Sequence, residues 1–366
     1  MTATGGTVCF LVPLGLMATA VGNPIASTRR AVVPKYVDHS NVTIYLDAGG
    51  REHAVTTLAD WTIRRGHILA GMQEVMGPLP PESRRVPLDV RTLEIHEDAK
   101  FVRKKITYAT EADCRVPAYL FLPKGLHGKV PGVLCPHPTA SSGKGRVAGL
   151  DGPPSRHYAL ELAQRGYVTI APDYVGFGEY RWDAYAHGYT SATMKGIWDH
   201  MRAVDVLQSE EQVDPERIAA IGHSLGGHNS LFAAVFDPRI KVVVSSCGFN
   251  AFRFYKGGDL SGWSHKGYMP KISGYGGWRN MPFDFHEVVA ALAPRPLFVN
   301  APLKDDNFDV RGVTEVVEAA GRVYRLLGAP HAITVVHPDG GHDFPDEVRD
   351  RVYKWLDEHL LGSAGR

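Results

Sequence analysis

Gly222-His223-Ser224-Leu225-Gly226 is the most informative segment of this 366-residue chain. The apolar run 217–221 before it predicts a buried strand, and the run 227–234 after it predicts a helix. A serine between two glycines, on a sharp turn from strand to helix, is typical of a nucleophile elbow. Such a turn pushes the serine hydroxyl out at one end of a sheet, above the first N–H groups of the helix.

Two further segments carry the partners that a serine nucleophile needs, in the expected order of acid and then histidine. The strand predicted at 296–300 is followed by a loop with Asp305 and Asp306, and the strand predicted at 332–337 is followed by a loop with His342. Adjacent loop residues point in different directions, so only one of the two carboxylates can hold the histidine. The other is expected to cap the next helix or to bond loop amides.

The chemistry explains why these residue types are required. A serine hydroxyl is a poor nucleophile near neutral pH, so an imidazole must take its proton, and a carboxylate holds the imidazole in the correct tautomer. Charge that develops on the substrate carbonyl oxygen needs fixed N–H donors. The backbone N–H of Leu225 is the first expected donor. The second is expected in the loop after the strand 131–135, where Pro138 has no N–H and Thr139 is the better candidate.

From about Lys100 to Leu361 the chain resembles a serine hydrolase of the α/β-hydrolase superfamily, in the branch of dienelactone-hydrolase-like and acetyl-xylan-esterase-like proteins. Besides the elbow, the resemblance is carried by Ala-Pro-Asp-Tyr-Val-Gly-Phe-Gly at 171–178, Val-Asp-Pro-Glu-Arg-Ile at 213–218 and Gly-Gly-His-Asp-Phe at 340–344. It implies an α/β fold with a mostly parallel eight-stranded sheet and helices on both faces. Alignment of the 298–300 strand with the typical seventh strand favours Asp305 as the acid, so the implied catalytic residues are Ser224, Asp305 and His342.

The chain also departs from well-known members of that branch. Dienelactone hydrolases proper carry cysteine where Ser224 stands. The well-studied acetyl xylan esterases have Gln where Leu225 stands and an Arg-Gly-Gln-Gly element that is missing here. Glucuronoyl esterases carry a different elbow sequence, and the His-Gly-Gly-Gly form of many lipases is absent from 136–139. The resemblance therefore implies the fold and the triad but no particular substrate.

Bulk composition agrees with an enzyme that has no nucleic-acid or membrane partner. The chain is 44% hydrophobic and has a net charge of +1, which gives no general attraction to polyanions. The four cysteines form no metal spacing or disulfide framework, and the 17 histidines show no helical pairing. No metal and no cofactor are therefore expected, and Cys135 and Cys247 are expected to be buried free thiols.

The sequence predicts three parts: 1–30, a signal peptide or disordered tail; 31–90, a strand and helix extension; and 91–366, the catalytic domain with an insertion at 249–285. The apolar run 8–21 includes Ala18-Thr19-Ala20, which resembles a cleavage site, yet no Lys or Arg precedes it. It is too short to span a membrane. Location stays open, with export favoured over the cytoplasm.

Two insertions, 174–191 and 249–285, leave strand ends where the triad would meet and are expected to shape the pocket. Both are rich in aromatic residues, which fit stacking against sugar rings or phenolic acyl groups. The alternative is that most of them pack as the insertions' own small core. The pocket candidates are His137, Phe177, Trp182, Trp263, Tyr268 and Trp278.

The expected function is a serine esterase that forms an acyl-enzyme on Ser224 and acts on short-acyl, carbohydrate-linked or aryl-linked esters. The substrate would be a small-molecule or polysaccharide-linked ester, and oligomeric state is not inferable. Two alternatives stay open: a prolyl-oligopeptidase-like serine peptidase, and a non-catalytic binding protein that keeps the fold.

Overall fold

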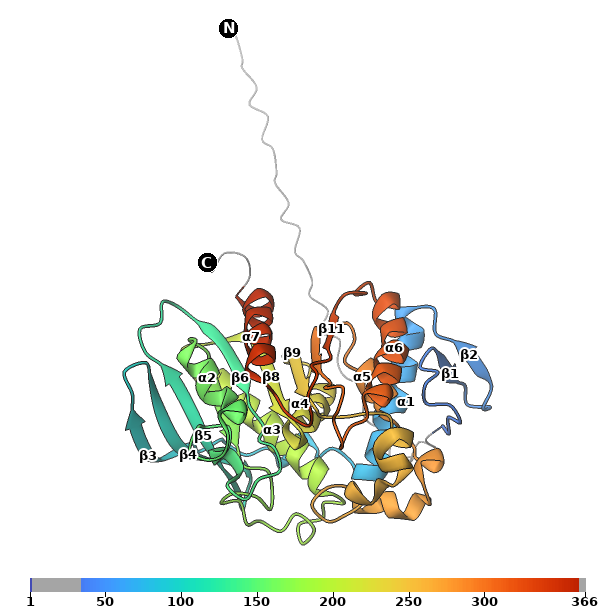
Figure 1. The fold of residues 1–366 in the computed structure, drawn as a ribbon, viewed down its shortest axis with the longest axis horizontal. Helices are drawn as coiled ribbons and strands as arrows, with labels where there is room; N and C mark the ends of the chain where they lie inside the picture. Colours follow the sequence, from blue (N-terminus) through green and yellow to red (C-terminus); the bar gives the residue numbers. More distant parts are fainter. Residues whose placement is uncertain (2–33, 362–366) are drawn as a thin grey trace. The chain divides into compact units, whose positions relative to one another are not determined.

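A central sheet organises the fold, with its strands in the order β11-β10-β9-β8-β6-β7-β5-β4-β3 (Figure 1). The structure is a computed structural model that describes Met1 and residues 34–361. Contacts divide the chain into Met1–Val32 and Val33–Arg366, and the sheet belongs to the second part. The parallel strands are β6 (Val130–Leu134), β7 (Val168–Pro172), β8 (Val213–His223), β9 (Ile240–Ser246), β10 (Leu297–Asn300) and β11 (Ile333–Val336). The predicted tail at 1–30 lies outside the described residues except for Met1.

Three antiparallel strands extend the sheet at one end: β3 (Arg91–Glu97), β4 (Phe101–Glu111) and β5 (Cys114–Pro123). The described sheet therefore has nine strands, one more than the eight expected. Every residue of β3 is exposed, and the strand pairs only with β4. Because none of its side chains is buried, β3 lacks the alternation of buried and exposed residues that marks a strand in a sequence.

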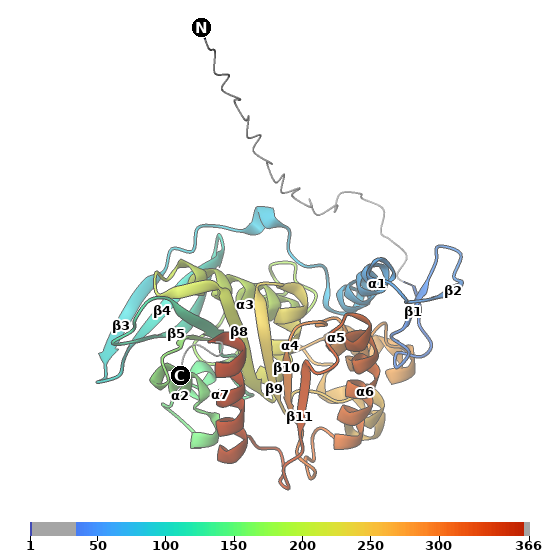
Figure 2. The ribbon, with the colours of Figure 1, turned by 90° about the horizontal axis from the view of Figure 1, so that it is seen from above.

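Helices cover both faces of the sheet, as the sequence predicts. The first face carries α2 (Tyr158–Gln164) and α7 (Asp346–Leu360), and the second carries α3 (Ala192–Ser209), α4 (Leu225–Phe236), α5 (Phe285–Ala290) and α6 (Val310–Leu326) (Figure 2). Neighbouring residues of β8 belong to different cores: Ala220 packs on the second face, and Ala219 and Ile221 pack on the first. This two-residue period is what a strand buried on both faces requires.

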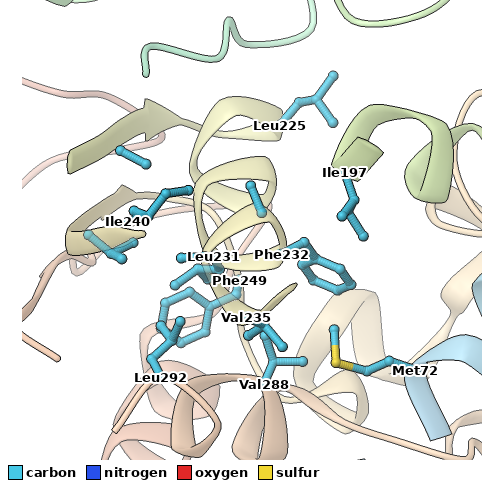
Figure 3. Packing of buried hydrophobic residues seen from close by; sticks show 14 of the residues in the cluster. Met72, Ile197, Leu225, Leu231, Phe232, Val235, Ile240, Phe249, Val288 and Leu292 are labelled. Atoms are coloured by element: carbon cyan, nitrogen blue, oxygen red, sulfur yellow. The ribbon is translucent and has the colours of Figure 1, made fainter. Parts of the chain in front are cut away.

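The chain before the sheet forms a small hairpin and a long helix. β1 (Ile44–Leu46) pairs antiparallel with β2 (Glu52–Ala54), and α1 (Leu58–Met76) begins at a capping box formed by Thr57 and Asp60. The side chain of Met72 reaches the second-face core near α4 and α5 (Figure 3). A Cβ at Gly71 would lie 2.4 Å from the carbonyl oxygen of Pro282, so glycine allows close packing of α1 here.

A buried charged cluster joins this N-terminal segment to α5. Arg64 is fully buried and forms a salt bridge with Glu287, and His39 Nδ1 lies 2.8 Å from the same carboxylate. Burial alone would lower the pKa of His39, but the charge and hydrogen bond of Glu287 outweigh it and raise that pKa to about 9. Burial raises the pKa of Glu287, yet His39 and Arg64 together hold it at about 2. His39 and Glu287 are therefore both charged near neutral pH.

The insertion 249–285 consists mainly of short 3-10 turns: η4 (Phe252–Gly258), η5 (Leu260–Gly262), η6 (Pro270–Tyr275) and η7 (Trp278–Asn280). Among the described residues, no helix has both the length and the apolar character that crossing a bilayer would need.

Candidate active site

Ser224 stands between the end of β8 and the start of α4, with the strand and helix that the sequence predicts on either side. Its backbone has φ 55° and ψ −122°, a strained conformation for a residue other than glycine. The flanking glycines make this turn possible. A Cβ at Gly222 would lie 2.1 Å from the carbonyl carbon of Gly226, and one at Gly226 would lie 2.2 Å from the carbonyl oxygen of Pro136.

Asp305 and His342 lie side by side, although 37 positions of sequence separate them. Nδ1 of His342 is 3.0 Å from each carboxylate oxygen of Asp305. Burial raises the pKa of Asp305, but the hydrogen bond and charge of His342 and the backbone N–H groups of Phe308 and Asn307 lower it below 3.8 overall. The ionised carboxylate therefore requires a proton on Nδ1, which leaves Nε2 as the basic nitrogen.

The neighbouring Asp306 is exposed, whereas Asp305 is buried. The expectation that it caps the next helix is wrong, because Asp309 is the N-cap of α6 and accepts a hydrogen bond from the Arg311 N–H at 2.9 Å. Asp309 is the residue immediately before the helix, which is where a capping side chain can reach the free N–H groups.

Hydrogen bonds tie the ends of three strands together beneath the site. Ser246 Oγ lies 3.0 Å from Nδ1 of His223 and accepts from Nδ2 of Asn300 at 2.8 Å. The same Asn300 amide donates to the backbone oxygen of Asp343 at 2.9 Å, next to His342. Burial lowers the pKa of His223 well below 6.5, so this ring is neutral. The network fixes the loop that carries His342 against β8, β9 and β10.

Cys247 adds a thiol to the same corner. Its Sγ, the Asp305 carboxylate and a ring nitrogen of His342 lie within 4.8 Å of one another, a group that could hold a metal ion. Burial and then the charge of Asp305 raise the pKa of Cys247 well above 9, so the thiol is protonated. Metal binding here would require its deprotonation and would displace the His342–Asp305 hydrogen bonds. Cys135 and Cys247 are both buried free thiols, as expected.

A cavity of about 240 Å³ opens beside Ser224. Ser224, His342 and Thr139 all line it, so the predicted nucleophile, base and second oxyanion donor meet at one opening. Leu225 is the first residue of α4, which places its N–H at the helix N-terminus next to the serine. The helix dipole favours negative charge at that end.

Two arginines that the sequence reasoning missed also line this cavity. Arg146 follows the turn η2 (Gly143–Gly145), and Arg156 ends η3 (Pro154–Arg156), both in the segment between β6 and α2. Arg156 forms a salt bridge with Asp343 and donates from Nη2 to the backbone oxygen of His342 at 3.2 Å. Their position in the segment that also contains Thr139 was the one feature of the sequence that could have indicated a place at this cavity.

The six aromatic pocket candidates are not among the residues that line this cavity. Trp263 is only 5% exposed, and its ring packs against those of His228 (centroids 4.8 Å apart), Phe285 (5.8 Å) and Phe308 (6.0 Å). It is therefore buried in the second-face core, where the insertion packs against α4. A core position was the alternative considered, but the partners lie partly outside the insertion. Trp278 is partly buried, and the Arg279 guanidinium lies 4.4 Å from its ring centroid.

The other four candidates differ in how they relate to the cavity at Ser224. Tyr268 is the one with a direct link, because its hydroxyl is 3.0 Å from Oγ1 of Thr139. His137 is buried and accepts from the Tyr174 N–H at 3.0 Å, and Phe177 packs on it with centroids 5.7 Å apart. Trp182 lines a separate cavity of about 390 Å³.

Comparison with known proteins places this geometry in a family. The family model described as "Prolyl oligopeptidase family" matches residues 155–363, more than half of the chain. The chain belongs to the prolyl oligopeptidase family. The matched region includes Ser224, Asp305 and His342. The match agrees with the resemblance to α/β-hydrolase enzymes that the sequence motifs carry.

Individual relatives include proteins named as hydrolases and esterases. YtaP of Bacillus subtilis (strain 168), whose name describes it as a hydrolase, is 28% identical over 298 residues, covering 78% of this chain and 96% of YtaP. A 4-O-methyl-glucuronoyl methylesterase of Schizophyllum commune is 24% identical, covering 84% of this chain and 80% of that protein. The structure of a glucuronoyl esterase from Solibacter usitatus has a TM-score of 0.71 and 22% identity over 90% of this chain and 99% of that one.

The structural likeness confirms the predicted α/β-hydrolase fold. Carboxylic ester hydrolases are among the relatives of this enzyme, as the sequence predicts.

Proposed function

We propose that the protein is a serine esterase that cleaves carboxylic esters through an acyl-enzyme on Ser224. One observation carries the proposal: His342, hydrogen-bonded to Asp305, lines the same cavity as Ser224, which stands on a strained turn between strand and helix.

In the proposed reaction, Nε2 of His342 takes the proton of Ser224 as Oγ attacks the ester carbonyl carbon. Asp305 stabilises the imidazolium that forms, because its carboxylate accepts from Nδ1. The N–H groups of Leu225 and Thr139 receive the oxyanion. Collapse expels the alcohol, which takes the proton from His342. Water then attacks the acyl group by the same route and restores the free serine.

The size of the cavity and the names of the relatives support short-acyl or carbohydrate-linked esters. A cavity of about 240 Å³ is small compared with ordinary ligand sites of about 300–1,000 Å³, so a long acyl chain would not fit inside it. The relatives include a glucuronoyl methylesterase and a glucuronoyl esterase. Aryl esters with short acyl groups share the same size limit.

Peptide hydrolysis is the second candidate activity, because the family is named for a peptidase and one relative is named dipeptidyl-peptidase 5. The two activities use the same triad chemistry and differ in the leaving group. Release of nitrophenol from nitrophenyl acetate, with none of nitroaniline from aminoacyl anilides, is the result expected of an esterase. The reverse pattern would establish the peptidase.

Labelling with a fluorophosphonate probe tests the assignment of the nucleophile. We expect the probe to label the wild type but not Ser224→Ala, and turnover to be lost in that variant. The exposed Ser261 provides the matched control, since Ser261→Ala should keep both labelling and turnover. Labelling of Ser224→Ala at another serine would overturn the assignment.

Substitution of the two neighbouring aspartates tests the acid. Asp305→Asn should lower kcat for nitrophenyl acetate by about 10⁴, because the neutral amide no longer selects the required tautomer of His342. Asp306→Asn should leave kcat within about twofold, as expected for an exposed side chain. A large loss in Asp306→Asn alone would transfer the role to that residue.

A further inference from the structure

We propose that the site selects esters whose alcohol part carries an anionic group, and that Arg146 is the residue that binds this group. The inference rests on the proposed esterase activity and adds a substrate class to it. It is carried by the composition of the cavity wall, by the state of the Arg146 side chain and by the position of Arg156 beside His342.

The cavity wall at Ser224 is rich in positive charge. Two of its lining residues are arginines, and none of the described residues that line it carries a carboxylate. The remaining lining residues are the serine and histidine of the site, the neutral His223, Thr139 and two prolines. Each arginine is paired with a carboxylate outside this wall, Asp151 for Arg146 and Asp343 for Arg156, so an anionic group of the substrate would be the first negative charge to meet the guanidinium groups from inside the cavity.

Arg146 has hydrogen-bonding capacity that the fold does not use. Its Nε is buried and lacks a hydrogen-bond partner among the described residues, and because that atom is closed to solvent, a ligand in the cavity would bind the terminal Nη groups. Its Nη2 lies 3.0 Å from Asp151, a carboxylate that is 45% exposed and outside the cavity wall. An ion pair with such an exposed partner contributes little, so a carboxylate that enters the cavity can compete for the guanidinium.

The backbone is shaped to receive this side chain. Gly152 has φ 74°, and a Cβ at that position would lie 1.9 Å from Nη1 of Arg146. The guanidinium therefore packs directly on the main chain of residue 152. This contact holds a long side chain in place at the cavity, as a binding residue requires.

The position of Arg156 assigns the anionic group to the alcohol part of the ester. The leaving oxygen must lie near Nε2 of His342, because it takes its proton from there. Arg156 contacts the backbone oxygen of His342 and lines the same cavity as Arg146. Since Arg156 holds the backbone of His342 at this wall, the inference assigns the part of the substrate beyond the leaving oxygen to the side of the cavity that the two arginines line.

The test compares two aryl acetates that differ in one charge. For each variant, the measured quantity is kcat/KM for the charged 4-acetoxybenzoate divided by kcat/KM for the neutral methyl 4-acetoxybenzoate. This ratio should be higher in the wild type than in Arg146→Gln. We expect that ratio to fall by about ten- to a hundredfold in Arg146→Gln, the range for losing a hydrogen bond to a charged group. Because each ratio is compared between variants, the different intrinsic reactivity of the two esters cancels.

Two variants and one measurement on the wild type complete the design. Arg146→Lys keeps the charge and should retain part of the preference, whereas Arg351→Gln, an exposed arginine of α7, should leave the ratio unchanged. In the wild type, the product 4-hydroxybenzoate should inhibit at lower concentration than its methyl ester. This inhibition should weaken with added salt, since salt screens the interaction.

An unchanged ratio in Arg146→Gln would overturn the inference, as would equal inhibition by the two products in the wild type. Monomethyl succinate, which carries its charge on the acyl part, tests the side assignment. If Arg146→Gln impairs only this ester, the anion belongs to the acyl part and the assignment is wrong. Failure of the wild type to cleave any ester or to react with the fluorophosphonate would instead refute the proposed function.

Discussion

Replacement of His39 by glutamine should remove a pH-dependent part of the protein's stability. Both ring nitrogens of His39 face acceptors, with Glu287 2.8 Å from Nδ1 and the Met281 carbonyl oxygen 2.8 Å from Nε2. The ring must be protonated to donate to both. A pKa raised from 6.5 to about 9 corresponds to about 3 kcal/mol of stabilisation.

The sign follows from the direction of that change. Because the pKa is higher in the folded protein, the stabilisation is complete below pH 6.5 and is lost as the pH rises through about 9. The quantity to compare is the free energy of unfolding of the wild type minus that of His39→Gln at each pH. This difference should be about 3 kcal/mol larger at about pH 6 than at about pH 10. The packing cost of the substitution is the same at both pH values and does not enter this comparison.

Urea unfolding followed by tryptophan fluorescence at a series of pH values measures the effect. Other groups also titrate in this range, so the informative quantity is the difference between wild type and variant at each pH. His331→Gln, which removes an exposed imidazole, is the matched control and should differ from the wild type by a constant amount. A His39→Gln difference that stays constant, or that grows with pH, would refute the reasoning.

Two further substitutions test the elbow and the insertion. Gly222→Ala should abolish fluorophosphonate labelling and lower the melting temperature, because its Cβ would meet the Gly226 carbonyl at 2.1 Å, whereas Gly274→Ala, with no atom within 4 Å of its Cβ, should do neither. Trp263→Ala should lower the free energy of unfolding by about 3–5 kcal/mol, as loss of a buried aromatic ring does. Trp278→Ala, at a partly buried position, should lower the free energy of unfolding clearly less than Trp263→Ala does. Equal decreases in urea titrations would contradict the core position of Trp263.

The features that the sequence predicted well are those encoded locally. A strand, a turn with two glycines and a helix stand next to one another around Ser224, so their pattern is visible without tertiary structure. The order of strands and loops likewise indicated that His342 would meet an acidic loop residue, and the family resemblance favoured Asp305 over Asp306. Parallel strands bring such loops to one edge of a sheet whatever the details of packing.

The features that were missed depend on contacts between distant segments. His39, Arg64 and Glu287 come from three separate parts of the chain, and nothing local distinguishes a buried arginine from an exposed one on a helix. Arg146 and Arg156 stand in a loop whose path is set by what packs around it. The position of β3 as a ninth strand could not be inferred because its side chains face water.

Composition also misled about the aromatic insertion. An abundance of Trp, Tyr and Phe fits a sugar-binding surface and a small hydrophobic core equally well, because both bury aromatic rings. The structure packs Trp263 against His228 of α4 and Phe285 at the start of α5, in the second-face core. Which direction a ring faces depends on the turns that precede it, and these 3-10 turns have no strong sequence pattern.

The exposed edge strand β3 affects how copies of the protein behave at high concentration. An edge strand offers unpaired N–H and C=O groups that can recruit a strand from another molecule, the first step of sheet-to-sheet aggregation. Along β3, Glu94 lies between the exposed apolar Leu93 and Ile95, and the charged Arg91 and Glu97 stand at the two ends of the strand. An antiparallel copy centred on this strand would place two Glu94 carboxylates opposite one another, and like charges there oppose extension of the sheet.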